Sequence, residues 1–252
     1  MEDFTLEGYR QLLLAFANQG YHCSLFNGLE ERLERGEKVL ILRHDIDISL
    51  KAAWEIARLE HALGFQATYF VMLSSPFYNV LSTESARFLD QMHAYGHDIA
   101  LHIDLQDHHG QYLDVEHEIE ILAHFYPYVN REIASVHSPR TLASIPVEQA
   151  RPIYRVYHLA QRGDLAYISD STGRWRYGHP LQSTAFREGK PIQLLTHPIW
   201  WVAEGATPRQ KLESWFYRSY EGNLELARTF LPKLFSQLSQ AHQASQPEPE
   251  TP

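Results

Sequence analysis

The chain has 252 residues, of which 44% are apolar, and it carries a formal net charge of -9. This length and apolar content are enough to bury the core of one large α/β domain. The acidic balance lacks the clustered lysines and arginines by which proteins bind nucleic acid or anionic membrane surfaces. We therefore expect neither nucleic acid nor an anionic membrane surface as a partner.

The single cysteine and the first residues bear on the cellular compartment. Cys23 has no second cysteine to pair with, which agrees with a reducing compartment. The opening sequence MEDFTLEGYRQLLLAF carries acidic residues where a signal peptide needs basic ones. No apolar stretch reaches the ~20 residues needed to cross a bilayer. We expect a soluble, cytoplasmic protein without a membrane span.

In its first half the chain alternates strand patterns with helix patterns. Apolar runs rich in β-branched and aromatic residues predict strands, while helix formers between a polar cap and a glycine predict helices. A helix is predicted to begin after the N-cap Ser49, and another to be capped by Thr83 and ended by Gly96. In chain order we predict a helix over 4–18, strands over 39–44, 66–73 and 98–104 with helices after the first two, and a helix over 114–127.

The second half continues the pattern less regularly. Strands are predicted over 133–138, 165–171 and 192–198, with a poorer helical pattern between the first two. A long helical region over 207–240 has Pro208 in its first turn and a break at Pro232. We predict one α/β domain over 1–240, with a parallel sheet, and a disordered tail over 241–252.

Polar side chains gather at the ends of these strands. Parallel α/β sheets bind their ligands at the carboxyl ends of the strands, so residues at these positions are candidates for a site. Each of five predicted strands ends in side chains that can titrate or bind metal. These are Asp45 with Asp47, His102, His137, Asp170 and His197.

Each candidate also has a structural explanation. Asp45 and Asp47 point to the same face, which suits a shared cation, but one could instead cap a helix while its neighbour pairs with Arg43. His102 competes with 14 other histidines, because the chain has 15 in total. His137 and His197 each stand at a proline-ended strand, where a buried turn histidine is equally compatible with the sequence.

Asp170 and the nearby tryptophans also allow two interpretations. Asp170 could orient an imidazole or a substrate hydroxyl, or form a turn with its own backbone. Trp200 follows His197 closely and could stack on a sugar ring, although aromatic residues near proline are often core residues. Trp175 lies on the loop after Asp170.

Taken together, these segments resemble the polysaccharide deacetylase superfamily, the NodB-like carbohydrate esterases, from residue 41 to residue 201. RHDID is similar to the first motif of that family, GHDIALH to the second, SDSTGRW to the fourth and LLTHP to the fifth, while HSPR stands where the third is expected. The resemblance implies a distorted (β/α) barrel of about seven strands. It further implies that Asp45 is the general base, Asp47 and His102 are metal ligands, and His197 is the general acid.

One position departs from the family pattern. Family members have a second metal histidine four residues after the first, and this chain has Gln106 there. The third ligand is then His137, Asp104 or His108, unless the metal is lost; His137 is preferred because it ends a neighbouring strand. Histidine and carboxylate ligands suit zinc, with iron, cobalt or nickel as alternatives.

These expectations define a metal-dependent deacetylase. Asp45, His197 and Asp170 would be catalytic, and Asp47, His102 and His137 would bind the metal. Arg140, Trp175 and Trp200 would contact an N-acetylated sugar or glycan precursor. Alternatives are a hydrolase of a non-sugar amide C–N bond and an inactive carbohydrate-binding or regulatory module.

Overall fold

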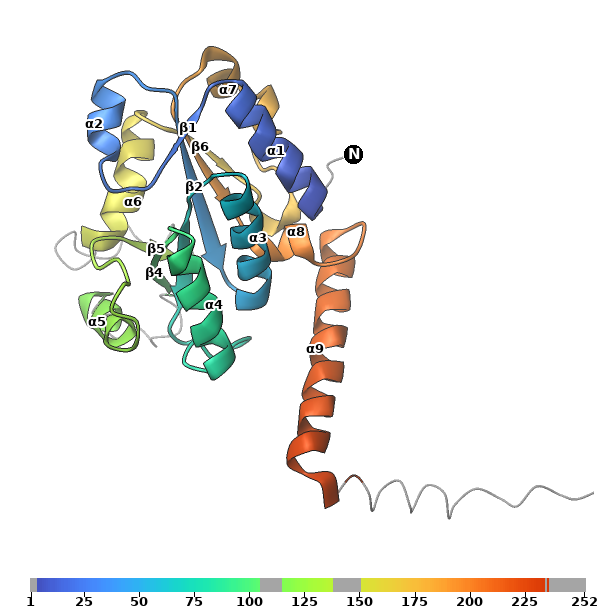
Figure 1. The fold of residues 1–252 in the computed structure, drawn as a ribbon. Helices are drawn as coiled ribbons and strands as arrows, with labels where there is room; N and C mark the ends of the chain where they lie inside the picture. Colours follow the sequence, from blue (N-terminus) through green and yellow to red (C-terminus); the bar gives the residue numbers. More distant parts are fainter. Residues whose placement is uncertain (1–3, 105–114, 138–150, 234, 236–252) are drawn as a thin grey trace, which may run out of the picture. The chain divides into compact units, whose positions relative to one another are not determined.

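The chain forms a mixed α/β structure around one parallel sheet (Figure 1). The computed structural model describes residues 4–104, 115–137, 151–233 and 235. Two compact units divide the chain, Met1–Ala203 and Glu204–Pro252. Every strand of the described residues lies in the first unit, and the second contains the long helix α9 (Pro208–Phe230).

The sheet has seven strands, all paired in parallel. Six follow the order β5-β4-β3-β2-β7-β6, and β1 pairs with β2 outside this path. No pairing joins β5 to β6 among the described residues, so the sheet forms a half-barrel. The strands are β1 (His22–Ser24), β2 (Val39–Ile46), β3 (Thr68–Met72), β4 (Asp98–Ile103), β5 (Ala134–Val136), β6 (Ala166–Ser169) and β7 (Ile192–Thr196).

Helices surround this half-barrel, which confirms the predicted α/β fold of the distorted (β/α) barrel type (Figure 1). Most connect one parallel strand to the next, as parallel pairing requires. The helices of the first unit are α1 (Leu6–Asn18), α2 (Leu29–Glu34), α3 (Leu50–Ala62), α4 (Thr83–Ala94), α5 (Val115–Phe125), α6 (Arg151–Arg162), α7 (Thr184–Glu188) and α8 (Pro198–Val202). Short 3₁₀ turns cover Ser171–Gly173 and Pro180–Gln182.

Helix ends agree with the sequence prediction in most places. Ser49 caps α3 by accepting a hydrogen bond of 3.1 Å from the Ala52 amide. The prediction of Thr83 as a cap is wrong, because Ser82 accepts from the Ser85 amide and Thr83 is already helical. Pro208 stands in the first turn of α9, and the helix ends before Pro232, as predicted. The domain limits at residue 240 stay a prediction, and the predicted tail lies outside the described residues.

Strand β2 is at the centre of the sheet. One edge of β2 pairs with β7 over residues 40–44, while the other is shared by β1 over 39–41 and by β3 over 43–46. All eight residues of β2 are buried. Because side chains alternate along a strand, Arg43 and Asp45 point to one face, the inner face, and His44 points to the other, the outer face, toward α3.

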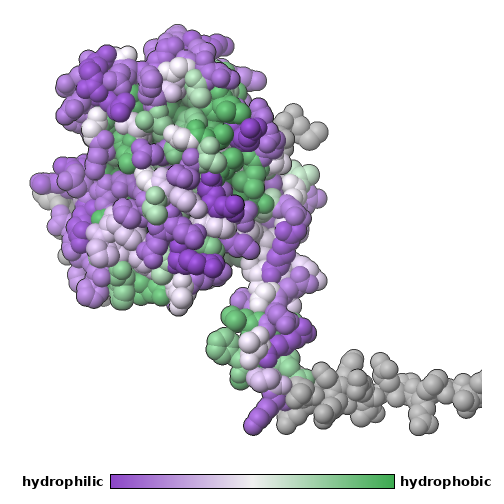
Figure 2. Space-filling view, in the orientation of Figure 1, coloured by the Kyte–Doolittle hydropathy of each residue, from purple (hydrophilic) through white to green (hydrophobic). Residues whose placement is uncertain are grey.

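The face of the first unit seen in Figure 2 is mainly polar. In the view of Figure 2, hydrophilic side chains cover most of the first unit, with apolar areas between them. Among the described residues, none of the helices combines the length and the apolar character that crossing a membrane would need.

Candidate metal centre

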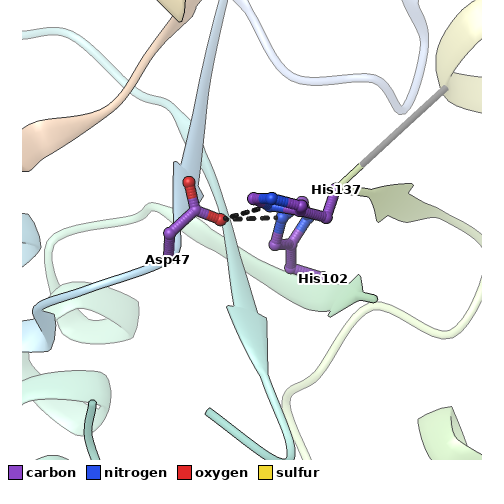
Figure 3. A group of neighbouring side chains, drawn as sticks. All are labelled: Asp47, His102 and His137. Atoms are coloured by element: carbon purple, nitrogen blue, oxygen red, sulfur yellow. Dashed lines mark hydrogen bonds and ion pairs between the residues drawn. The ribbon is translucent and has the colours of Figure 1, made fainter. Parts of the chain in front are cut away.

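Three side chains meet at the carboxyl ends of the strands (Figure 3). Asp47 follows the end of β2, His102 is in β4, and His137 follows β5. His102 Nε2 and His137 Nδ1 each lie 3.1 Å from the same oxygen, Oδ1 of Asp47. The three ligand atoms lie within 4.8 Å of one another, so this triad could hold a metal ion. His137, the preferred third ligand, is thus the residue that the structure brings to the other two.

The donor set and its charge fit a divalent cation. Two imidazoles and one carboxylate are ligands that zinc and other first-row metals accept. Burial alone would raise the pKa of Asp47, but hydrogen bonds with His102 and His137 and the charges of His102 and His197 hold it well below its usual value. The hydrogen bond to Asp47 also raises the pKa of His137. The carboxylate is therefore ionised at neutral pH.

Among the described residues of the triad, His137 is the most exposed. The His102 side chain is 1% exposed and that of Asp47 is 23% exposed, whereas that of His137 is 50% exposed. A ligand from solvent therefore reaches the site past His137. The loop after β3 fixes the other side, since Ser75 donates to the Asp47 carbonyl over 3.3 Å and Tyr78 donates to the Ile46 carbonyl over 2.8 Å.

Asp45 lies beneath the triad and pairs with Arg43. Arg43 Nε donates to Asp45 Oδ1 over 3.0 Å, and Nη2 donates to Oδ2 over 2.7 Å. Both side chains are buried, and Nη2 also donates to the Tyr157 hydroxyl of α6. Burial would raise the pKa of Asp45, but the charges of Arg43 and His102 outweigh it and lower the pKa. This is the ion pair that the sequence offered as the structural explanation of Asp45.

His197 and Asp170 form a second pair beside the triad. His197 Nδ1 lies 2.7 Å from Asp170 Oδ1, and His197 Nε2 lies 3.8 Å from Asp47 Oδ2. Asp170 is fully buried and also accepts from the His197 amide and from Trp201 Nε1. Burial would lower the pKa of His197, but the hydrogen bond and charge of Asp170, together with Asp47, raise it to about 9. Asp170 therefore orients an imidazole, one of its two predicted roles.

The predicted substrate-binding residues are placed differently. Trp175 is 7% exposed and packs against Phe4 and Trp201, with ring centroids 5.6 and 5.7 Å away. Trp200 is also buried. Neither ring offers an open face for stacking, because other side chains surround it, so their role in binding stays a prediction. Arg140, Gln106 and His108 lie outside the described residues.

Ser135 is a residue of the site that the sequence does not predict. Its hydroxyl lies between His102 and Asp45, on the inner face of β5. A lone serine in a short strand carries no signal by itself. Only the pairing of His102 with Ser135 across β4 and β5, which is a long-range contact, reveals its position.

The site therefore has two parts. The triad can hold a divalent cation, and the imidazole of His197 lies beside it, oriented by the buried carboxylate of Asp170. Compared with models of known protein families and with curated proteins, the chain matches none of them. The fold and the site define the molecule as a (β/α) half-barrel protein with a candidate metal centre at the carboxyl ends of its strands.

Proposed function

We propose that the protein is a metal-dependent hydrolase that removes an acetyl group from the nitrogen of an N-acetylated sugar or glycan precursor. The observation that carries this proposal is the placement of His197 Nε2 3.8 Å from the ligand residue Asp47. A metal ligand and a proton-carrying imidazole then face the same small volume. Hydrolysis of an amide needs both, since the carbonyl must be polarised and the departing amine must be protonated.

Asp47, His102 and His137 would hold the metal, with zinc preferred over iron, cobalt or nickel for this donor set. When bound, a divalent ion supplies Lewis-acid polarisation of a carbonyl oxygen and a more acidic water. The half-exposed His137 marks the side from which the substrate enters. The assignment to acetylated sugars comes from the resemblance in the motifs around residues 41–201.

His197 would give a proton to the departing amine. Asp170 accepts from Nδ1 and leaves Nε2 directed toward Asp47, so the ring presents one defined nitrogen to the site. With a pKa raised to about 9, the imidazole is charged at neutral pH and can act as an acid. The base role that the resemblance implies for Asp45 would require one of its oxygens to reach the water, and both already accept hydrogen bonds from Arg43.

A specific observation favours a second substrate class. The two tryptophans predicted to stack on a sugar, Trp175 and Trp200, are both buried. A hydrolase of a non-sugar amide C–N bond would use the same metal centre and the same acid without a stacking platform. Release of acetate from N-acetylated amino sugars, their glycosides and non-sugar N-acetylated amines, measured side by side, decides between the two.

The proposal predicts that His197→Ala lowers kcat by about 10²- to 10⁴-fold on the best substrate of that panel, because it removes the proton donor. Stoichiometric zinc should still bind, since His197 is not in the triad. His22→Ala is the matched control, because His22 is exposed and pairs with Val39 at the opposite end of β2. Wild-type turnover in His197→Ala, or no acetate release by the zinc-loaded wild type, would contradict the proposal.

A further inference from the structure

Behind His102, on the side away from Asp47, three polar side chains form a continuous hydrogen-bonded chain. His102 Nδ1 lies 2.6 Å from Ser135 Oγ. Ser135 Oγ lies 3.1 Å from Asp45 Oδ1. Asp45 is held in turn by the two hydrogen bonds from Arg43. All four side chains are buried on the inner face of the half-barrel.

The direction of each hydrogen bond follows from what each group can donate. A carboxylate paired with a guanidinium only accepts, so the single hydroxyl proton of Ser135 goes to Asp45. The Ser135 oxygen must then accept from His102, which places a proton on Nδ1. With Nδ1 committed to Ser135, the nitrogen left for a metal is Nε2, which faces Asp47. The chain of contacts thus selects the tautomer that a metal needs.

The anchor of this chain is rigid. Ser135 belongs to β5 and Asp45 to β2, and two strands separate them in the sheet, so their contact crosses the concave inner face. Arg43 is fixed from a third direction, because its Nη2 donates to Tyr157 over 2.6 Å and its guanidinium lies 4.7 Å from the centre of that ring. Groups behind a metal-binding imidazole of this kind set its orientation and basicity.

We propose that Ser135 and Asp45 are positioning residues, which hold the His102 ring so that its Nε2 points into the metal triad. Asp45 then acts through Ser135 and His102 rather than as the general base. This inference rests on the metal centre of the proposed function. It assigns a role to Ser135 and a different role to Asp45, both of which can be tested without turnover.

The first test is zinc affinity, measured by competition with a chromophoric chelator. Ser135→Ala should weaken zinc binding by about 10- to 100-fold, as for other residues that orient metal ligands. Ser135→Thr keeps a hydroxyl and should remain close to the wild type. Ser24→Ala is the matched control, since Ser24 is a buried strand serine of the same sheet whose hydroxyl donates to the neighbouring Leu25 carbonyl. Equal affinity in Ser135→Ala and Ser24→Ala would overturn the proposal.

The second test uses metal-free protein, so that its outcome does not depend on the proposed function. The wild type should show a slowly exchanging imidazole N–H signal from His102 Nδ1 in proton–nitrogen NMR spectra, assigned by its absence in His102→Gln. Ser135→Ala should lose that signal or shift it strongly, and Ser135→Thr should keep it. If zinc fails to bind but this pattern holds, the proposed function fails and the positioning chain stands. An unchanged signal in Ser135→Ala would overturn the proposal that Ser135 positions His102.

The third test separates positioning from base catalysis at Asp45. A positioning role predicts that Asp45→Asn weakens zinc binding, and that the Ser135→Ala/Asp45→Asn double variant loses little more than either single variant, because both break one chain. A base role predicts full zinc affinity in Asp45→Asn with turnover lost. Asp45→Asn leaves the buried Arg43 without its carboxylate partner and could prevent folding. In that case the zinc affinity of Ser135→Ala still tests the proposal.

Discussion

Strand β2 supplies side chains to two polar clusters on opposite faces of the sheet, and the two differ in kind. On the inner face, Asp45 lies beneath the metal triad, and Asp47, just after the end of β2, belongs to it. The triad is exposed to solvent at His137. On the outer face, His44 contacts Glu60 of α3, in a cluster with no exposed member. Both contain histidines and a carboxylate, and only the first has a side from which a ligand can enter.

The Glu60 cluster is closed because every polar group in it has a partner. Tyr9 donates to Glu60 Oε1 over 2.6 Å, and Tyr69 donates to Oε2 over 2.5 Å. His44 Nε2 donates to Oε1 over 2.8 Å, and its Nδ1 lies 2.7 Å from the Thr196 hydroxyl. A buried carboxylate with all of its acceptors occupied contributes to the stability of the fold.

The comparison teaches that residue types alone do not mark a site. In the Glu60 cluster, hydroxyls and an imidazole satisfy the carboxylate completely. In the triad, two imidazoles contact one oxygen of Asp47, and the His137 side chain is half exposed to solvent. The candidate metal centre differs from the Glu60 cluster because its three ligand side chains converge on one point and one of them, His137, is exposed to solvent.

The largest expected effect separates the two clusters by stability. Glu60→Ala should lower the free energy of unfolding by about 3–5 kcal/mol, since it leaves buried hydroxyls and an imidazole without their acceptor. Asp47→Ala should lower it by less, about 1–2 kcal/mol, while abolishing zinc binding, because only His102 among its two imidazole partners is buried and the half-exposed His137 can bond to water instead. Urea unfolding and chelator competition measure the two quantities. Similar unfolding free energies for the two variants would break the comparison.

A smaller effect tests the carboxylate behind His197. Trp201→Phe removes the donor to Asp170 Oδ2 at 2.8 Å, and we expect a loss of about 1.5–3 kcal/mol in the free energy of unfolding beyond that of Trp200→Phe. Trp200 is the matched control, since it is buried on the same helix and its Nε1 has no partner among the described residues. Equal losses in urea unfolding would show that the hydrogen bond from Trp201 contributes nothing.

The smallest expected effect is a pH dependence at His97, which borders the Glu60 cluster. Its Nδ1 accepts from the Ala67 amide and its Nε2 donates to the Ala57 carbonyl, so the folded state holds the ring neutral. Burial lowers the pKa of His97 despite the nearby charge of Glu60. The unfolded chain therefore binds a proton first, and the stability that the neutral ring contributes is lost as the pH falls below about 6.5.

The destabilisation caused by His97→Gln, measured by urea unfolding, should accordingly be larger at pH 8 than at pH 5.5. His22→Gln, at an exposed position of β1, serves as the control. An equal cost of His97→Gln at both pH values would show that the neutral ring is not what stabilises this region.

Much of the fold was predictable because local patterns determine it. The strand and helix alternation, the N-cap Ser49 and the helix end before Pro232 all depend on neighbours in the sequence. The sequence did not predict β1, α2, α7 and α8, which are brief. It did not predict α6 either, although the buried residues of that helix recur at helical spacing. The sequence does not distinguish Ser82 from Thr83 as the cap, because both are good capping residues and only the backbone conformation decides between them.

The metal triad was predictable because strand ends of a parallel sheet converge, so Asp47, His102 and His137 could be related through topology alone. The residues that surround the triad were not predictable from the sequence. The chain through Ser135 and the Glu60 cluster depend on contacts between residues 90 and 51 positions apart in the sequence. The burial of Trp175 depends on Phe4 and Trp201, which no local pattern connects to it.

The alternation along β2 makes its alignment unusually strict. A shift of one position against β3 and β7 would turn His44 inward and carry the guanidinium of Arg43 toward Glu60, so both clusters would lose their partners at once. A misaligned β2 would therefore lose polar contacts on both faces of the sheet. The Glu60 cluster on the outer face thereby helps to fix the register that the metal triad on the inner face requires.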